Sequence, residues 1–328
     1  MPQTKSEVAD SLWSSVRKIV DPKQPEDNFF EDYPTLGRMR SPAYRVSDGG
    51  SSEIQVTLQG SGGTAQAFDT YDTLNKEPID PFEAAFFNRR YYAVPVILSD
   101  TEHWENMGPE RVFDLFKGLE TNASSSIVKA INEDIYTAQA GKNILGFPDL
   151  MATSTGATIG GIVSSSSTFW ESQRNTTAKT FLTQTTTNIY DGFTEWEKLL
   201  DDIRIQGGNA TDMFTTFSIT RAYRTALRSE GYARTELSNA TGVGGPHAPK
   251  WDGINVVADN DVPALHTYIT DKRHLKLRTL KQAAFQKTPF VSLQSNGQLA
   301  QLAYVVASVQ LTTNNRRRLG VATAITGS

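Results

Sequence analysis

The sequence predicts an α+β fold in which one domain interrupts another. Three observations support this prediction: one helical pattern is much longer than an average globular helix, residues 153–270 alternate between helices and strands, and the last third is mostly strand-like. The strands near the C-terminus are expected to pair with the strand that precedes the long helix. Their domain would then be discontinuous, with residues 153–270 inserted into it.

The first 42 residues predict a short amphipathic helix and an arm. Thr4 and Glu7 have the spacing of a capping box, and an apolar stripe follows them. Residues 23–42 are rich in proline and acidic residues. We expect this segment to be an extended arm that is anchored on another surface by Phe29 and Phe30. A disordered linker is the alternative.

The next segment predicts a β-hairpin. Residues 53–59 alternate between apolar and polar, and residues 64–71 form the returning strand. Gly60, Gly62 and Gly63 supply the turn geometry between them. A two-stranded hairpin is marginal in water and leaves strand edges unpaired, and few large apolar residues flank this one. We therefore expect it to lie against a neighbouring subunit, with these glycines at the contact.

Aromatic and β-branched residues at 84–98 predict a strand, and Pro95 marks it as an edge strand or a bulge. The longest helix follows at 109–138, with Pro109 at its first position. Its apolar stripe consists of Val112, Phe116, Leu119, Ala123, Ile127, Ile131 and Ile135. About 30 residues span roughly 45 Å, which is typical of an elongated molecule.

The remaining chain predicts an α/β layer and then strands. Residues 153–187 are rich in Ser, Thr and Gly, but their bulky apolar side chains favour a folded, loop-rich segment. A second amphipathic helix ends near Gly207. A strand at 213–217 and a helix at 218–230 follow. The last strands are expected at 254–258, 264–270, 275–280, 290–294 and 299–311.

The composition excludes several classes of function. The 328 residues carry 32 basic and 36 acidic side chains, and the net charge of -4 argues against a polycationic nucleic-acid binder. Without cysteine there is no disulfide, thiolate metal site or cysteine nucleophile. No apolar run approaches the ~20 residues of a membrane span, and the polar N-terminus lacks the core of a secretory signal. We expect a soluble protein.

No motif predicts catalysis, a cofactor or a metal. Residues 60–65 match a dinucleotide-binding pattern, but strand-like residues follow where that motif needs a helix N-terminus. The four histidines are scattered. Asp259 and Asp261 on a predicted loop indicate at most a weak cation site, and a solvated turn is the simpler interpretation. We predict that the chain is not an enzyme and has no cofactor.

Charged residues concentrate at a few places. Acidic residues on the second helix, Glu195, Glu197, Asp201 and Asp202, most simply form a solvated face. Basic residues gather at Arg89 and Arg90, at 272–278 and at 316–318. In a net acidic chain we interpret them as edge-strand gatekeepers and subunit salt bridges. Arg89 and Arg90 are therefore expected at subunit contacts.

The order of these features resembles the major capsid proteins of tailed bacteriophages, which have the HK97 fold. The resemblance covers nearly the whole chain. Each motif is short and structural, so the resemblance is specific because of the order of the motifs and not because of any single one. The first motifs are RRYYAVPV at 89–96, MGPE at 107–110 before the long helix, GGI at 160–162 and FWE at 169–171. The later ones are VVAD at 256–259, YI at 268–269, LKL at 275–277 and the stretch 314–321.

The resemblance implies a division of the chain into four parts. These are an N-terminal arm at 1–42, an extended loop at 43–90, a peripheral domain at 91–146 and 279–328 with a spine helix at 109–138, and an axial domain at 147–278. In this family the extended loop lies over a neighbouring subunit. Some members begin with a long, removable scaffolding segment. Here only 42 residues precede the loop, so either scaffolding is a separate protein or the segment has been removed. Met1 favours a separate scaffolding protein.

The implied function is that of a major capsid protein. Copies would assemble in the host cytoplasm into hexamers and pentamers of an icosahedral shell that encloses double-stranded DNA in the virion. A portal and decoration proteins are further implied partners, and no membrane is involved. Two alternatives remain. One is an encapsulin-like shell with an inner cargo pocket, and the other is an α/β enzyme with an unrecognised site in one deep polar pocket.

Overall fold

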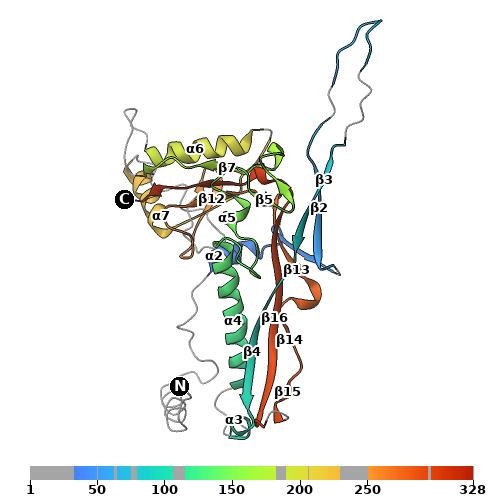
Figure 1. Cartoon of the computed structure of the whole chain (residues 1–328). Coiled ribbons are helices and arrows are strands. Elements are labelled where there is room, and N and C mark those ends of the chain that lie inside the picture. The colour runs from blue at the N-terminus through green and yellow to red at the C-terminus, as the bar shows by residue number, and fades with distance from the viewer. Residues whose placement is uncertain are drawn as a thin grey trace. The chain divides into compact units, whose positions relative to one another are not determined.

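The computed structural model describes residues 33–49, 51–62, 65–74, 80–105, 115–181, 190–205, 207–229, 250–294 and 297–327 (Figure 1). The predicted N-terminal helix, the arm residues Phe29 and Phe30, and Gly63 lie outside these residues. The chain divides into two compact units, which we describe separately. Within the described residues the first comprises 92–129 and 283–307, and the second comprises 33–91, 130–282 and 308–327.

The first unit contains one part of a six-stranded sheet, and in this part three strands pair with β16. Strands β4 (Arg90–Ser99), β14 (Gln286–Lys287) and β15 (Val291–Ser292) each pair with β16 (Ala300–Thr313). This confirms the predicted pairing of the closing strands with the strand before the long helix. Among the described strands β4 pairs with β16 alone, so Pro95 lies in an edge strand, as predicted. The short helix α3 (Asp100–Glu105) follows β4.

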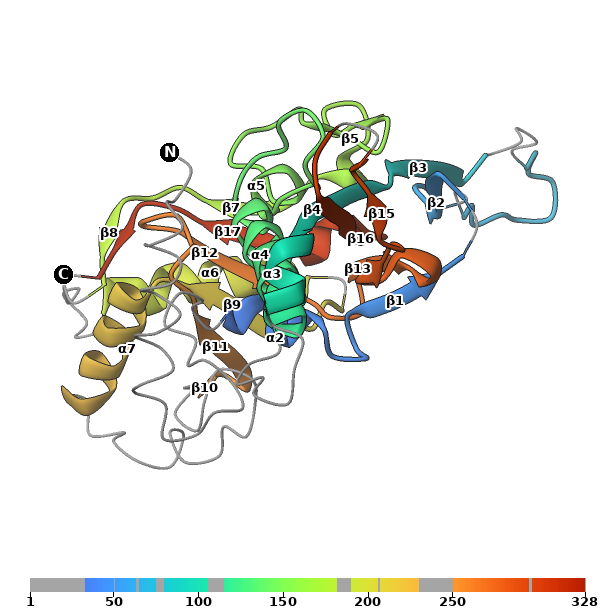
Figure 2. The same ribbon diagram turned by 90° about the horizontal axis from the view of Figure 1, so that it is seen from below.

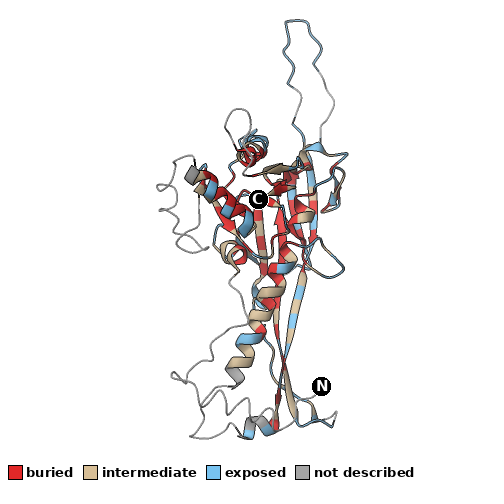
Figure 3. Ribbon diagram, turned by 90° about the vertical axis from the view of Figure 1, so that its left-hand side faces the viewer, coloured by how far each residue is buried: buried red, intermediate tan, exposed pale blue. Residues whose placement is uncertain are grey.

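Helix α4 (Leu115–Ile135) confirms the predicted long helix and runs along this sheet (Figures 1 and 3). Four members of the predicted stripe are buried: Ala123, Ile127, Ile131 and Ile135. The predicted start at 109 lies outside the described residues. The helix ends at Ile135 and not at 138, because the next turn tightens: the Thr137 N–H donates to the Asp134 carbonyl three residues back, at 3.3 Å.

The second unit contains a six-stranded mixed sheet. Its order is β10 (Lys250–Trp251), β11 (Ile254–Ala258), β9 (Asp212–Thr215), β12 (Thr267–Thr270), β17 (Gly320–Ala322) and β7 (Gln173–Asn175). We call it the second sheet. Every residue of β9 and β12 is buried, as expected for central strands that are covered on both faces. Strand β12 begins at Thr267 and not at 264, because the backbone of Leu265 is left-handed (φ 68°).

Two helices pack against the second sheet and confirm the two predicted ones. They are α6 (Asp191–Arg204), which contacts β7 and β17, and α7 (Phe217–Ser229), which contacts β11. Trp196 of α6 is fully buried at the centre of an aromatic cluster. Its ring centroid lies 5.0 Å from that of Phe181, 5.6 Å from Tyr223 and 5.4 Å from Trp251. This cluster forms one part of the core of the second unit.

The rest of the second unit consists of short elements. They are α2 (Pro34–Met39), β1 (Arg45–Asp48), α5 (Phe147–Leu150), β5 (Thr158–Ile159), β6 (Ile162–Val163), η1 (Thr168–Trp170), β8 (Lys179–Thr180), β13 (Leu275–Leu280) and β18 (Ile325–Thr326). Strand β13 pairs with β1 in parallel and with β16 residues 309–313 antiparallel. Trp170 and Phe181 are fully buried, which confirms the folded, loop-rich segment. The domain boundaries stay a prediction.

The structure corrects the predicted hairpin (Figure 2). Strand β2 (Glu53–Gln59) lies where expected, but it pairs with β3 (Phe82–Asn88), and residues 65–71 contain no strand. The reason is that alternate residues of β2 are buried and need buried partners across the ladder. Ala65 and Ala67 are exposed and cannot supply them. Across the observed ladder, Ile54 faces Phe87 and Val56 faces Ala85.

Candidate functional site

The two described hairpin glycines lie in different surroundings. The Gly60 N–H donates to the Pro81 carbonyl at 2.9 Å, at the base of the hairpin. A Cβ on Gly60 would lie 2.6 Å from the ring of Phe169, whereas a Cβ on Gly62 would meet no atom within 4 Å. Gly60 is therefore required for close packing inside the chain. Gly62 faces open space.

The two predicted arginines lie where β3 ends and β4 begins. The Arg89 Nε donates to the Ser51 carbonyl at 2.6 Å, and an Nη lies 3.5 Å from Asp48. Its side chain is buried by these contacts, which explains why the predicted strand at 84–98 is divided here. Arg90 is half-buried, and its Nε has no hydrogen-bond partner in the described part of the chain. A contact of either residue with another subunit stays a prediction.

Exposed aromatic side chains follow the hairpin glycines, and sequence reasoning missed them. Residues 65–74 lie beyond the ends of β2 and β3 and are pale blue in Figure 3. Phe68 is 68% exposed and Tyr71 is 98% exposed. A signal was present, because both residues lie in a largely polar stretch whose nearest apolar neighbours are small alanines. We call residues 65–74 the connection.

A second exposed apolar surface lies on the sheet of the first unit. Along β16, Ala303 and Val305 are buried, whereas Tyr304 between them is exposed. Strand β15 contributes the exposed Val291, and β4 contributes the exposed Ile97. One face of this sheet is thus covered, and the other presents apolar side chains to solvent. Such surfaces are typical of sites where another protein binds.

A pocket of about 500 Å³ lies beside the base of the hairpin. It is lined by Leu58, Gln59, Gly60, Ser61, Gly62, Thr168, Phe169, Trp170, Asn314, Asn315 and Arg317. The lining offers amides, hydroxyls and one guanidinium, which can bind a polar group. It contains no carboxylate, imidazole or amine that could serve as a general base.

Asp259 and Asp261 correct a prediction. Asp259 is buried, so the predicted solvated turn is wrong for this residue. Its carboxylate accepts a hydrogen bond from the Thr35 N–H at 3.2 Å, and Asn132 donates to Asp261 at 2.6 Å. Burial, and then the nearby charge of Asp259, raises the pKa of Tyr136 well above its ordinary value. In the described residues, no group of three His, Cys, Asp or Glu side chains could hold a metal.

Arg316 is buried and bonds only to backbone carbonyls in the described structure. It donates to the carbonyls of Asp149 at 3.1 Å, Leu150 at 2.9 Å and Trp170 at 3.1 Å. Burial lowers the pKa of Arg316 to about 10. Sequence reasoning placed this residue in a basic run that we interpreted as edge-strand gatekeepers and subunit salt bridges, but it connects segments of the second unit through their backbone.

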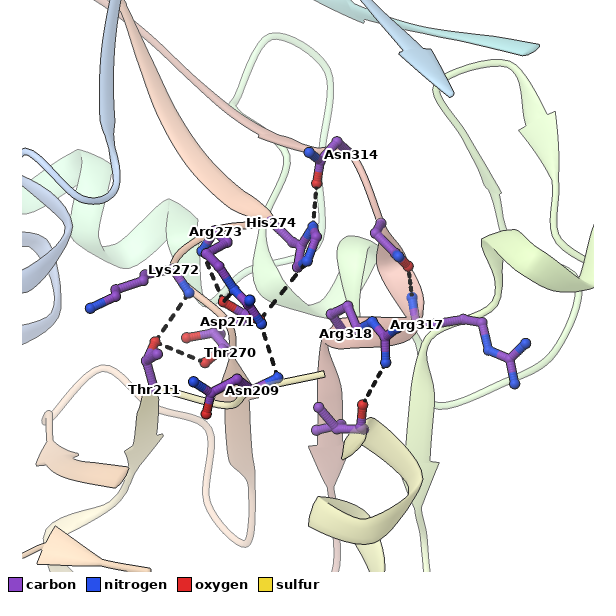
Figure 4. A network of polar contacts seen from close by, with 12 residues as sticks. Asn209, Thr211, Thr270, Asp271, Lys272, Arg273, His274, Asn314, Arg317 and Arg318 are labelled. Carbon is purple, nitrogen blue, oxygen red and sulfur yellow. Dashed lines mark hydrogen bonds and ion pairs between the residues drawn. The ribbon is translucent and has the colours of Figure 1, made fainter. Parts of the chain in front are cut away.

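The basic segments 272–278 and 316–318 meet around Asp271 (Figure 4). The buried Asp271 carboxylate accepts from the Arg273 guanidinium at 2.8 Å and from the Asn209 N–H at 3.4 Å. Burial alone would raise the pKa of Asp271, but the hydrogen bonds and the charge of Arg273 outweigh it and hold the pKa below its ordinary value. Arg318 donates to the Ile203 carbonyl at 3.0 Å. Asp271 thus connects the turn after β12 to the segment that follows α6, and Arg318 separately connects the segment after β16 to the end of α6.

None of the described helices is long and apolar enough to cross a membrane. No family model matches the chain, and no curated protein sequence matches it.

Solved structures match almost the whole chain. The capsid of cyanophage A-1(L) has a TM-score of 0.68 at 16% identity, and the match covers 94% of this chain and 96% of that one. The capsid of a native GTA particle has a TM-score of 0.62 at 14% identity, covering 93% and 95%. The SrpI encapsulin of Synechococcus elongatus has a TM-score of 0.58 at 9% identity, covering 99% and 97%. These likenesses confirm the predicted architecture: the chain has the HK97 fold that capsid and encapsulin shells share.

Proposed function

We propose that the chain is the major capsid protein of a tailed bacteriophage. Copies assemble into hexamers and pentamers of an icosahedral shell that encloses double-stranded DNA. The shell is part of the virion and is built in the host cytoplasm. A separate scaffolding protein, a portal and decoration proteins are its expected partners. The chain acts through packing and not through catalysis.

One observation carries the proposal: besides scattered exposed apolar side chains, two groups of them form surfaces that the described part of the chain does not cover. The first is the connection, with Phe68 and Tyr71. The second is the open face of the first unit's sheet, with Ile97, Val291 and Tyr304. Apolar surface of this kind is stabilised when a neighbouring molecule covers it. In a shell, every subunit supplies both surfaces to its neighbours.

The similarity to an encapsulin keeps a cargo compartment as the second candidate. The phage capsid favours the first candidate, because its TM-score and its sequence identity are both higher. The two candidates differ in their contents. A phage shell assembled with its portal and packaging partners protects DNA from nuclease, whereas a cargo compartment encloses protein.

The purified chain tests the proposal by light scattering and negative-stain electron microscopy. We expect closed particles for the wild type. Phe68→Ser combined with Tyr71→Ser should lower the particle yield by on the order of tenfold, because the connection loses its apolar contacts. The matched control is Phe217→Ser, which removes an aromatic side chain that is 60% exposed on α7. It should assemble as the wild type does.

Two results would contradict the proposal. The first is a stable monomer of the chain's own mass, 36.1 kDa, at high protein concentration. The second is an equal loss of particles in the control and in the connection variant, since a general loss of solubility would then explain both.

A further inference from the structure

Most charged groups that the sequence singles out are solvated or bound within the chain. On α6, Glu195 is buried and pairs with Lys198 at 2.8 Å, so the predicted solvated face is wrong for this residue. It fits the exposed carboxylates of the same helix, Glu197, Asp201 and Asp202. Arg317 differs from both groups, because it is half-buried in the lining of the pocket beside the hairpin.

The charge of Arg317 has no partner in the described part of the chain. Its backbone N–H donates to the Asn315 side chain at 3.1 Å, but its guanidinium forms no hydrogen bond or ion pair there. The guanidinium points away from the network around Asp271 (Figure 4). Among the described residues that line the pocket, Arg317 is the only charged one. The pocket therefore favours an anionic partner, and a carboxylate can accept two parallel bonds from a guanidinium.

The rest of the lining fits a carboxylate that lies beside an aromatic ring. Gln59, Ser61 and Thr168 are exposed, and their amide and hydroxyl groups can donate further hydrogen bonds. The half-buried ring of Phe169 supplies an apolar wall, and its centroid lies 6.4 Å from that of Trp170. A volume of about 500 Å³ can hold side chains of a partner.

The connection carries both kinds of group. Between residues 65 and 74 it has two carboxylates, Asp69 and Asp72, and no basic residue. Each carboxylate follows an exposed aromatic residue, Phe68 or Tyr71. Both carboxylates are exposed, and in the described chain they form no ion pair. The connection is thus complementary to the pocket in charge and in its apolar groups.

A turn already holds these side chains in place. The Asp72 N–H donates to the Asp69 carbonyl at 3.0 Å, and the Asp72 carboxylate accepts from the Asp69 N–H at 2.8 Å. The Asp69 carboxylate accepts from the Thr70 N–H at 2.7 Å. Only one oxygen of each carboxylate is used in these bonds, so the other stays available. A preformed turn loses little conformational entropy when it binds.

We propose that the connection of one copy binds in this pocket of a second copy. A carboxylate of the turn pairs with Arg317, and the neighbouring aromatic ring packs against Phe169. The contact rests on the proposed self-assembly and names the surface that the connection binds. Since each copy has one connection and one pocket, the contact can repeat around a closed ring. A nucleic acid is the less favoured partner of the pocket, because the chain is net acidic.

A double-mutant cycle tests the ion pair. Arg317→Met removes the charge of the pocket. Asp69→Asn with Asp72→Asn removes the charges of the turn but keeps the oxygens that its hydrogen bonds need. Each variant should raise the protein concentration that is needed for particle assembly by about tenfold. The combined variant should stay within about threefold of either one, because the second change removes nothing more, and a product of about a hundredfold would contradict the pairing.

The matched control is Lys142→Met, which removes an exposed cation elsewhere in the second unit. It should assemble as the wild type does, and circular dichroism should show that every variant is folded. For the wild type, raising the salt from about 0.1 to about 0.5 M should increase the required concentration, because salt weakens the ion pair.

Cysteine crosslinking tests the contact directly, since the chain has no cysteine of its own. One chain carries Thr70→Cys in the turn, and a second chain carries Thr168→Cys in the pocket. Oxidation of particles assembled from both should give a heterodimer on a non-reducing gel, because a disulfide needs Cα atoms within about 7 Å of each other. Thr225→Cys on the exposed side of α7 replaces Thr168→Cys in the control, which should give no heterodimer.

Each other outcome has a distinct meaning. If the wild type forms no particles, the proposed function fails. If the wild type forms particles, but neither neutralised variant weakens assembly and no heterodimer appears, the contact is overturned while the proposed function stands. If Arg317→Met lowers the nucleic acid that the particles hold, and the turn variant neither weakens assembly nor prevents that binding, the pocket binds phosphate and the proposed contact is wrong.

Discussion

The second sheet and the β2–β3 hairpin belong to the same unit, but they use their side chains differently. Every residue of β9 and β12 is buried, and the helices α6 and α7 complete that core. In β2 only alternate residues are buried, and the connection beyond it is exposed. The second sheet thus uses its apolar surface inside the chain, whereas the hairpin leaves part of its surface exposed, and we propose that another molecule covers it. Substitutions in the first region should change stability, and substitutions in the second should change assembly.

The largest effect on stability is expected for Trp196→Ala. It empties the centre of the aromatic cluster, and the free energy of unfolding should fall by about 3–5 kcal/mol. Guanidinium denaturation of dissociated subunits measures this. Phe68→Ala removes an aromatic side chain from the connection and should change the free energy of unfolding by less than about 0.5 kcal/mol. If the two substitutions lower the free energy of unfolding equally, the proposed difference between the core of the second unit and the connection is wrong.

Arg316→Met should have the next largest effect. The variant keeps much of the side-chain volume, but it leaves the carbonyls of Asp149, Leu150 and Trp170 without their donor. Burying acceptors without partners should cost roughly 2–3 kcal/mol, which a denaturation curve can resolve. The adjacent Arg317→Met is the control and should cost less than about 0.5 kcal/mol. If both variants lower the free energy of unfolding equally, the bonds of Arg316 to the backbone carbonyls do not stabilise the fold more than the contacts of Arg317 do.

Asp271→Asn should have a smaller effect that depends on pH. Because the folded-state pKa of Asp271 is lowered, its carboxylate stabilises the fold above the unfolded-state pKa of about 3.9. This stabilisation is lost as the pH falls through the folded-state value. We expect the variant to be about 1–2 kcal/mol less stable at neutral pH. Denaturation curves at several pH values should show that the difference shrinks in acid, and a constant difference would contradict the role of the charge.

Regular patterns in the sequence predicted the elements that are determined locally. The helical stripe of α4 and the alternation in β13 depend on residues that are close in sequence. The capsid-like order of the elements led to the HK97 fold, which the solved structures confirm.

The errors concern partners that are distant in sequence. The glycines after β2 indicated a tight turn, but the true partner β3 begins at Phe82, and the match between buried faces selects it. Asp259 follows a strand and was expected in a solvated turn. Its hydrogen-bond partner Thr35 is 224 residues away, so no local pattern could indicate the burial. The same holds for Arg316, whose carbonyl partners lie near residues 150 and 170.

The smallest expected effect is that of Gly60→Ala, which tests how firmly the hairpin is attached to its own unit. The new Cβ would lie 2.6 Å from the ring of Phe169, so the ring must move. Overpacking of this kind should cost about 1 kcal/mol. Gly62→Ala is the matched control, because its Cβ meets no atom within 4 Å. It should leave both stability and assembly unchanged.

A double-mutant cycle locates the cause of the Gly60 effect. Because Phe169→Ala removes the ring, adding Gly60→Ala to that variant should hardly change the free energy of unfolding. If Gly60→Ala then still lowers the particle yield, the glycine acts on a neighbouring subunit and not on Phe169. If Gly60→Ala lowers the free energy of unfolding equally with and without the ring, the backbone conformation of residue 60 causes the loss of stability. Only the first pattern, a cost that disappears with the ring, shows that the base of the hairpin is held inside its own chain while its connection stays available to another.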